Sequence, residues 1–316
     1  MKFGLDLPNM GGAGDPRLLA EIAHEAEESG WDGVFIFDSI LSPGWNSQFP
    51  DDPQKRATVD PWITLAAMAM RTERVTLGTM ITPLSRRRPW KVARETVTLD
   101  HLSNGRLVLP VGLGTVEDGG YINVGEELDR KKRAEMLDES LEIISGLWSG
   151  ENFAFEGEHY HVKEMRFEPK PVQSPRIPIW VVGAWPRPKS MRRAVRWDGI
   201  LPIVLPAGTE ATAAPDVAVA AKRIADTGVS LDITPEQIGE IRDYAQRERD
   251  SDAPFDIVLE ANSSPSRPDQ AAETLAKYEE QGATWYLEGI FSWLFLPPHD
   301  VDRMRDRIRK GPPRVS

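Results

Sequence analysis

Residues 73–114 have the sequence ERVTLGTMITPLSRRRPWKVARETVTLDHLSNGRLVLPVGLG, in which one helical segment joins two short apolar segments. The apolar segments, Val75 to Ile81 and Leu107 to Val111, have the length and composition of buried strands. The pattern between them predicts a helix from Trp90 to Leu102, which Ser103-Asn104-Gly105 ends. Two strands joined by a helix form a βαβ crossover, so we expect parallel pairing and a right-handed connection.

A glycine loop, Gly112-Leu113-Gly114, directly follows the second of these strands. Glycine lets a backbone approach a ligand closely, although an ordinary turn would use the same residues. The loop lacks the third glycine of the dinucleotide fingerprint, and no lysine follows it as in a phosphate-binding P-loop. We therefore expect a functional site where the two strands end, and not a Rossmann or P-loop site.

The alternation of strand and helix continues along the whole chain. Predicted strands start near residues 3, 33, 75, 107, 179, 199, 255 and 284, and a helical pattern follows each of them. This order is typical of a parallel sheet, and eight units suit closure into an α/β fold of the (β/α)8 barrel (TIM barrel) type. A doubly wound open sheet is the alternative. We expect one domain over residues 1–316, with an aromatic β-hairpin inserted within residues 151–178.

The composition excludes several classes of site and partner. The 316 residues have a formal net charge of -11 and include no cysteine. The negative charge disfavours nucleic acid, and the lack of thiols excludes disulfides, iron–sulfur clusters and thiolate zinc sites. No segment approaches the roughly 20 apolar residues that cross a bilayer, and Met1 to Pro8 lacks the apolar run of a signal peptide. We expect a cytoplasmic protein without nucleic-acid or membrane partners.

Two acids at predicted strand ends are candidates for catalysis. Asp38 and Glu288 each follow an apolar run, where an ionised carboxylate is costly unless it is paired. Each is therefore either functional or bound to an arginine. His159 and His161 flank Tyr160 in the predicted hairpin without a third ligand at useful spacing, so we expect no metal site.

A phosphate site is predicted where the strand before Gly183 meets the next helix. Gly183 to Lys189 places Arg187 and Lys189 at a helix N-terminus, whose unpaired N–H groups favour a phosphate, although a solvated turn is the alternative. Tryptophans such as Trp45, Trp185 and Trp293 fall in predicted loops, and they indicate an apolar pocket. Such a pocket suits a planar cofactor that supplies the chemistry itself.

Several segments together resemble the bacterial luciferase-like monooxygenase family. They are Leu77-Gly78-Thr79, Thr98 to Arg106, Val111 to Gly114 and the proline-rich run Phe167 to Pro175. The resemblance covers about residues 1–300, and the combination is more specific than any one segment. It implies a (β/α)8 barrel that binds FMN or the deazaflavin coenzyme F420 at the carboxyl ends of its strands.

The resemblance also assigns roles to single positions. Thr79 and Met80 stand where the family often has a non-prolyl cis peptide bond behind the isoalloxazine ring, Gly112, Leu113 and Gly114 would line the cofactor, and its phosphate would be bound by Gly183, Ala184, Trp185 and Arg187. Pro110 stands where the family usually has glycine. Ser39 and Thr115 replace a histidine and a glutamate of the sugar-phosphate dehydrogenases, which argues against that specific activity.

The resemblance implies a flavin-dependent oxidoreductase. The function that we expect first is that of a monooxygenase, which would use oxygen and reduced FMN from a partner reductase to oxidise an unknown organic substrate. The alternative is hydride transfer with coenzyme F420, and a further alternative is a non-catalytic flavin-binding protein, or an isomerase or lyase on the same barrel. The apolar segment Phe291 to Leu296 and the resemblance predict a homodimer.

Overall fold

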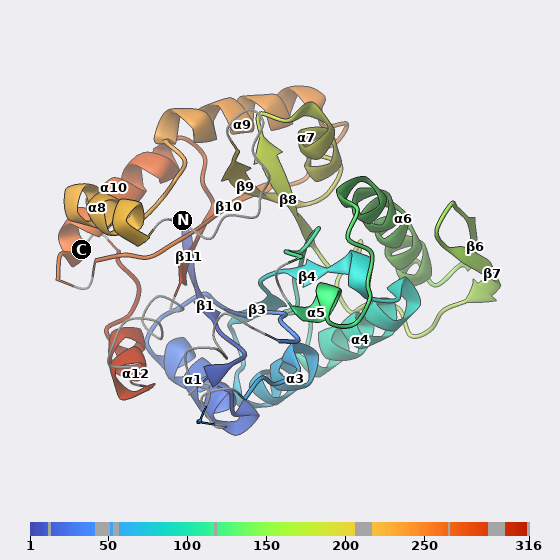
Figure 1. Cartoon of the computed structure of the whole chain (residues 1–316), viewed down its shortest axis with the longest axis horizontal. Helices are drawn as coiled ribbons and strands as arrows, with labels where there is room; N and C mark the ends of the chain where they lie inside the picture. The colour runs from blue at the N-terminus through green and yellow to red at the C-terminus, as the bar shows by residue number, and fades with distance from the viewer. Residues whose placement is uncertain are drawn as a thin grey trace. The chain divides into compact units, whose positions relative to one another are not determined.

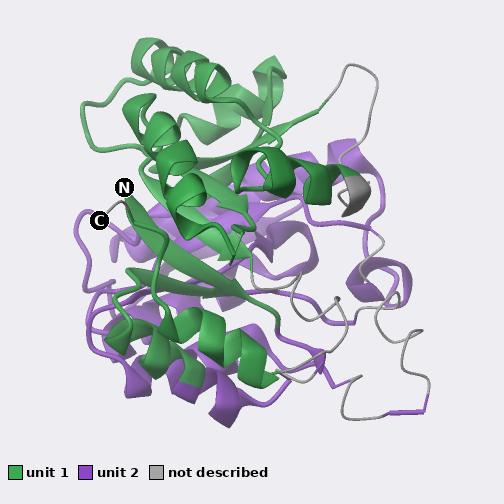
Figure 2. Ribbon diagram, turned by 90° about the vertical axis from the view of Figure 1, so that its left-hand side faces the viewer, with its two compact units in different colours: residues 1–8, 22–35, 180–316 green, residues 9–21, 36–179 purple. Residues whose placement is uncertain are grey.

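The computed structural model describes residues 1–11, 14–41, 51–52, 57–116, 119–205, 217–264, 266–289 and 301–314. The chain divides into two compact units, each discontinuous in sequence (Figure 2). Unit 1 consists of residues 1–8, 22–35 and 180–316, and unit 2 consists of residues 9–21 and 36–179. The expectation of a single domain stays a prediction.

Unit 1 is built on a sheet whose strands follow the order β2-β1-β11-β10-β9-β8 (Figure 1). Its strands are β1 (Lys2–Leu7), β2 (Gly33–Ile36), β8 (Ile179–Trp185), β9 (Gly199–Val204), β10 (Asp256–Ala261) and β11 (Trp285–Gly289). Its helices are α7 (Pro188–Ala194), α8 (Val217–Thr227), α9 (Pro235–Glu248), α10 (Pro268–Glu280) and α12 (Val301–Arg309), with the second half of α1 (Pro16–Glu28). The pairs β1–β11, β11–β10, β10–β9 and β9–β8 are all parallel, as predicted.

Unit 2 contains the opening βαβ segment and the inserted hairpin. Its elements are α3 (Pro61–Arg71), β3 (Thr76–Thr79), β4 (Thr82–Pro83), the 3-10 helix η2 (Leu84–Arg86), α4 (Pro89–Leu102), β5 (Leu109–Gly112), α5 (Gly119–Ile122), α6 (Arg130–Trp148), β6 (Asn152–Glu156) and β7 (His161–Arg166). β6 and β7 pair antiparallel, which confirms the hairpin. The short helix α5 lies in residues 115–128, for which the sequence predicts only a loop.

The predicted strand Val75 to Ile81 is interrupted near its end. β3 stops at Thr79, and β4 begins at Thr82 after a non-proline cis peptide bond between Met80 and Ile81. The expected position, Thr79-Met80, was therefore wrong by one peptide bond. β4 pairs in parallel with β5, where Thr82 is opposite Val111. If β3 and β4 are counted as one interrupted strand, the described elements match the eight predicted strands.

Two side chains of the Thr98 to Arg106 segment have structural roles. The buried carboxylate of Asp100 accepts hydrogen bonds from the backbone N–H groups of Val172 and Gln173 at 2.7 and 3.1 Å. Arg106 donates to the carbonyl oxygens of Ala69, Thr72 and Val75, at the connection between α3 and β3. A segment that resembles the family thus fixes the connection between α3 and β3 and the proline-rich run. Among the described residues, no helix is long and apolar enough to cross a membrane.

Candidate functional site

The carboxyl ends of β3 and β5 in unit 2 combine a polar interior with a partly exposed apolar surface. The buried hydroxyl groups of Thr79 and Thr82 bind each other at 2.6 Å on either side of the cis peptide. These two hydroxyls are therefore occupied with each other. The strand ends expose the half-buried apolar side chains of Met80, Ile81 and Leu113. Half-buried apolar side chains of this kind are typical of the lining of small-molecule sites.

Tyr121 of α5 fixes the glycine loop after β5. Its hydroxyl donates to the carbonyl oxygen of Leu113 at 2.8 Å and shares a hydrogen bond of 2.9 Å with Ser85. Arg133 of α6 donates to the carbonyl oxygens of both Leu113 and Gly114 at 3.0 Å. Burial raises the pKa of Tyr121, against the opposing effects of Ser85, Arg86 and Arg133, so this phenol stays neutral and able to donate. No sequence pattern points to Tyr121 or Arg133, because both belong to other elements.

We expect Gly114→Ala to destabilise the chain more than Gly30→Ala. Both glycines have positive φ, +71° and +85°, so each substitution introduces a left-handed alanine that costs about 1–2 kcal/mol. At Gly114 the new Cβ would also lie 2.5 Å from the Tyr121 hydroxyl and 2.7 Å from Pro83, whereas nothing lies within 4 Å at Gly30. Overpacking should add roughly 1–3 kcal/mol. Urea unfolding of both variants measures the difference, and equal losses would contradict this packing of the loop.

Asp38 is bound to two arginines of the basic turn, which consists of Arg86, Arg87 and Arg88. Its carboxylate accepts from Arg86 at 3.1 Å and from both the Nε and Nη2 atoms of Arg87 at 2.8 and 2.6 Å. The Asp38 side chain is fully buried, and Arg86 also donates to its backbone carbonyl. Burial of Arg87 disfavours its charge, but the negative charge of Asp38 and its hydrogen bonds more than offset this, and the pKa of Arg87 is raised. The sequence left Asp38 as either functional or bound to an arginine, and the structure contains the arginine pairing. Through these bonds the basic turn is held at the end of β2.

Glu288 in unit 1 has a complete set of partners. Its carboxylate accepts from the backbone N–H and hydroxyl of Ser263 at 2.8 and 2.6 Å, and from Arg307 of α12 at 3.2 Å. The Glu288 side chain is 0% exposed and that of Arg307 is 7% exposed. Like Asp38, this acid is matched to an arginine. A catalytic role for either acid stays a prediction.

A second pair of acids in unit 1 was not among the candidate catalytic residues. Asp6 of β1 is fully buried, and its interacting group is Glu260 of β10. Burial raises the pKa of Asp6 well above its usual range, and the charge of Glu260 raises it further. Burial also raises the pKa of Glu260. The signal in the sequence was an acid between Leu5 and Leu7, in a strand whose other residues after Lys2 are apolar or glycine.

The predicted phosphate segment lies at the end of β8. Gly183 is buried, and a Cβ there would meet Ile200 at 2.4 Å, so this glycine is explained by strand packing. The backbone N–H of Ala184 donates to the hydroxyl of Ser190 at 2.9 Å, and a cis bond joins Trp185 to Pro186. Arg187 is half-buried at the N-cap of α7. Phosphate binding by these residues stays a prediction.

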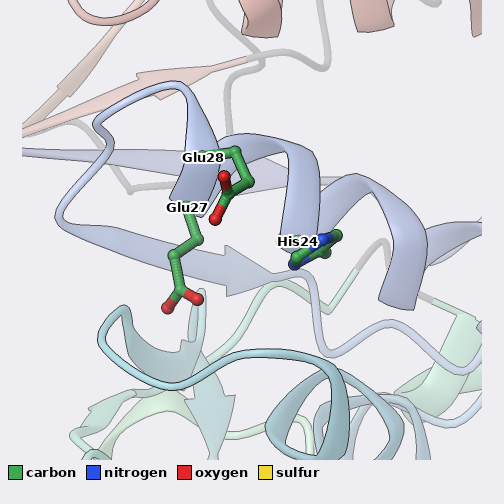
Figure 3. Close-up of side chains that lie close together, drawn as sticks. All are labelled: His24, Glu27 and Glu28. Carbon is green, nitrogen blue, oxygen red and sulfur yellow. The ribbon is translucent and has the colours of Figure 1, made fainter.

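In the described part of the chain, the two histidines of the hairpin each lie beside a glutamate. His159 lies 3.3 Å from Glu135, and the exposed His161 lies 2.8 Å from Glu156. One group of potential ligands occurs on α1, where His24, Glu27 and Glu28 have ligand atoms within 4.8 Å of one another (Figure 3). Glu28 is exposed, whereas Glu27 is buried and has another partner, so only part of this group is open to solvent.

Several predicted features lie outside the described residues. They are the loop tryptophans Trp45 and Trp293, the apolar segment Phe291 to Leu296 and the loop of residues 206–215.

The chain is similar to a known family and to several curated proteins. A family model described as luciferase-like monooxygenase matches residues 1–276. An F420-dependent glucose-6-phosphate dehydrogenase of Mycolicibacterium fortuitum is 29% identical over 330 residues, which cover 93% of this chain and 92% of that protein. A second, from Nakamurella multipartita, is 36% identical over 173 residues, 54% of this chain. That match spans 48% of the relative. The matches to the enzymes of the same name from Amycolatopsis mediterranei and Microbacterium testaceum span 49% and 48% of those proteins, so the chain spans about half the length of these relatives.

Solved structures of low identity share the fold. An F420-dependent secondary alcohol dehydrogenase has a TM-score of 0.71 at 17% identity, with 99% of this chain and 98% of that chain covered. The monooxygenase RslO1 from Streptomyces bottropensis has a TM-score of 0.70 at 18% identity, with 98% and 97% covered. Together with the family match, this likeness confirms the predicted (β/α)8 class over the open sheet.

Proposed function

Because the chain belongs to the luciferase-like monooxygenase family, we propose that it is an oxidoreductase that uses coenzyme F420 in hydride transfer. The observation that carries this choice is the likeness over nearly the full length of both chains to an F420-dependent enzyme. The sequence alone favours reduced FMN with oxygen, and this relative moves the preference to the alternative.

The strand ends of unit 2 fit a planar tricyclic ring. Met80, Ile81 and Leu113 offer an apolar surface, and the nearby hydroxyls of Thr79 and Thr82 are occupied with each other. The carbonyl oxygens of Leu113 and Gly114 are bound by Tyr121 and Arg133, so the loop is fixed before any ligand arrives. Such preorganisation lowers the entropy cost of binding.

A bound deazaflavin would supply the hydride acceptor. The protein would hold the ring in position and shield it from water. Met80, Ile81 and Leu113 would orient the ring and exclude water from one of its faces. Tyr121 and Arg133 would keep the Gly112 to Gly114 loop in place. Arg187, with Gly183, Ala184 and Trp185, would bind the phosphate at the β8 end.

We expect Arg187→Glu to weaken F420 binding by at least about tenfold, because one phosphate-binding cation would become an anion. Quenching of the intrinsic fluorescence of F420 by the purified chain measures the affinity. The matched control is Arg192→Glu, a charge reversal at an exposed position in the last turn of α7, which should change the affinity by less than about twofold. An unchanged affinity in Arg187→Glu would move the phosphate site elsewhere, and no quenching by the wild type would remove the proposed cofactor.

A second candidate is an FMN-dependent monooxygenase, and the match to the family described as luciferase-like monooxygenase supports the monooxygenase part of it. In that case a partner reductase would supply reduced FMN, and a homodimer would be the expected assembly. Oxygen consumption with chemically reduced FMN, with and without the protein, distinguishes the two candidates. Stimulated consumption that is coupled to a substrate would favour the monooxygenase over hydride transfer.

A further inference from the structure

Asp6 is a buried acid of unit 1 that lacks a hydrogen-bond donor among the described residues. It is 0% exposed, and neither its Oδ1 nor its Oδ2 atom accepts a hydrogen bond. A buried polar group without a partner is costly, and more so when it is charged. Asp38 and Glu288 avoid this cost because each is bound by an arginine. The Asp6 carboxylate therefore needs a neutralising partner of another kind.

The group that acts on Asp6 is a second acid, Glu260 of β10. Glu260 is the register neighbour of Leu287 on β11, and Asp6 of β1 is the register neighbour of Gly289, one layer further along the same face (Figure 1). Because Gly289 has no side chain, the two carboxyl groups can face each other over β11. No cation among the described residues acts on either acid.

A third oxygen atom lies on this face, from Asn262 directly after β10. The next residue, Ser263, donates to an acid on the opposite face, so alternation directs Asn262 to the face of Asp6. The Nδ2 atom of Asn262 lies 3.5 Å from Ser230, and its Oδ1 atom lies 3.1 Å from the position that a Cβ would have at Gly289. The amide oxygen and the Asp6 carboxylate thus flank the same glycine.

A shared proton alone would not satisfy this group of oxygens. A proton between two carboxyl groups makes one hydrogen bond, whereas both oxygens of Asp6 lack a donor. A cation can contact both oxygens of one carboxylate and also the oxygens of other side chains. Carboxylate and amide oxygens are the protein ligands that Ca²⁺ and Mg²⁺ prefer. The side chain of Glu260 is exposed, so solvent has access to the group and can supply water ligands.

We propose that Asp6, Glu260 and Asn262 form a binding site for a hard divalent cation, Ca²⁺ or Mg²⁺, over Gly289. All four residues belong to unit 1, and the proposal does not depend on the proposed function. The bound ion neutralises the two acids and is completed by water on the side of Glu260. It links β1 to β10 across β11, so its role is to stabilise strands that are distant in sequence.

The other buried acid on this face of β10 already has protein partners. Asp256 accepts hydrogen bonds from Thr284 at 2.8 Å and from the indole N–H of Trp180 at 3.1 Å. It lies four residues before Glu260, and side chains two or four apart on a strand share a face. Because its oxygens are occupied by donors, Asp256 offers a matched acid that should not bind the ion.

Thermal unfolding of the purified chain without cofactor measures the effect of the ion. The chain is first freed of metal with EDTA and dialysed into about 150 mM KCl, which screens its surface charges. Addition of CaCl2 or MgCl2 to about 10 mM should then raise the melting temperature by at least about 2 °C, because the ion binds the folded chain. Isothermal titration calorimetry should give one ion per chain. A saturating response to either ion supports the site, and the tighter ion is its occupant.

Asp6→Asn and Glu260→Gln should each reduce this rise to less than about 0.5 °C, since each removes a charged ligand. Glu260 is exposed, so Glu260→Gln decides the question if Asp6→Asn does not fold. Asp256→Asn is the matched control and should retain the full rise, whatever its own stability. A rise that persists in Glu260→Gln would show adventitious binding to surface acids. No saturating rise in the wild type with either ion would leave a shared proton as the partner of Asp6. Either result overturns the proposal.

Discussion

Replacing Arg307 by methionine is expected to lower the free energy of unfolding by about 3–5 kcal/mol, because it leaves the buried Glu288 carboxylate without its cation. Methionine keeps much of the apolar volume of the arginine, so the loss is electrostatic more than steric. Arg307 also lies over the Trp31 ring at 5.4 Å, and that contact would be lost as well. Guanidinium unfolding followed by circular dichroism measures the change.

The matched control is Arg309→Met, two residues along the same helix. Arg309 is 52% exposed and pairs with Glu25 and Asp306 at the surface, so its replacement should cost less than about 1 kcal/mol. The double variant Arg307→Met with Glu288→Gln should recover part of the loss, since no buried charge is then left unpaired. A single Arg307→Met variant as stable as Arg309→Met would show that Glu288 does not depend on this arginine, and its catalytic candidacy would gain weight.

Asp38→Asn is expected to lower the free energy of unfolding by a similar amount, about 3–5 kcal/mol, since the Asp38 carboxylate is the buried partner of two arginines. The Arg86 side chain is only 1% exposed, so water cannot replace the lost charge. The amide keeps the shape of the acid but would have to face two guanidinium groups with one oxygen and an NH2 group. Urea unfolding measures the effect.

Asp129→Asn serves as the control for Asp38→Asn. Asp129 is the exposed N-cap of α6, where it accepts from the Lys132 backbone at 2.9 Å, and asparagine caps helices about as well. Its replacement should change stability by less than about 0.5 kcal/mol. If Asp38→Asn kept wild-type stability while losing activity, the acid would be catalytic and the basic turn would not be its structural partner.

The architecture could be predicted because it depends on local periodicity. The eight strand starts and the hairpin within residues 151–178 follow from neighbours in the sequence, and the structure contains them. The cis peptide bond was expected between Thr79 and Met80, one residue too early. A family resemblance indicates the region in which such a bond occurs, but not the residue at which β3 is interrupted. Helix α5 is too short for a periodic pattern to show.

The partners of the candidate site residues could not be predicted, because they come from distant positions. Glu288 meets Arg307 on a later helix, and Asp38 meets arginines that are nearly 50 residues away. The burial of Asp6 could not be predicted for a different reason, which lies in the pattern of its own strand. In a strand of alternating apolar residues it has the pattern of a solvent-facing side chain, and only the sheet shows that both faces at that position are covered.

The central claim, a luciferase-like oxidoreductase that prefers F420, is tested most directly by equilibrium dialysis of the wild-type chain against an equimolar mixture of F420 and FMN. Both ligands then compete for one protein sample under one set of conditions. The account predicts that F420 is retained on the protein side in at least about tenfold excess over FMN, a difference of about 1.4 kcal/mol in binding free energy. Retention of FMN in preference to F420, or of neither, would contradict it.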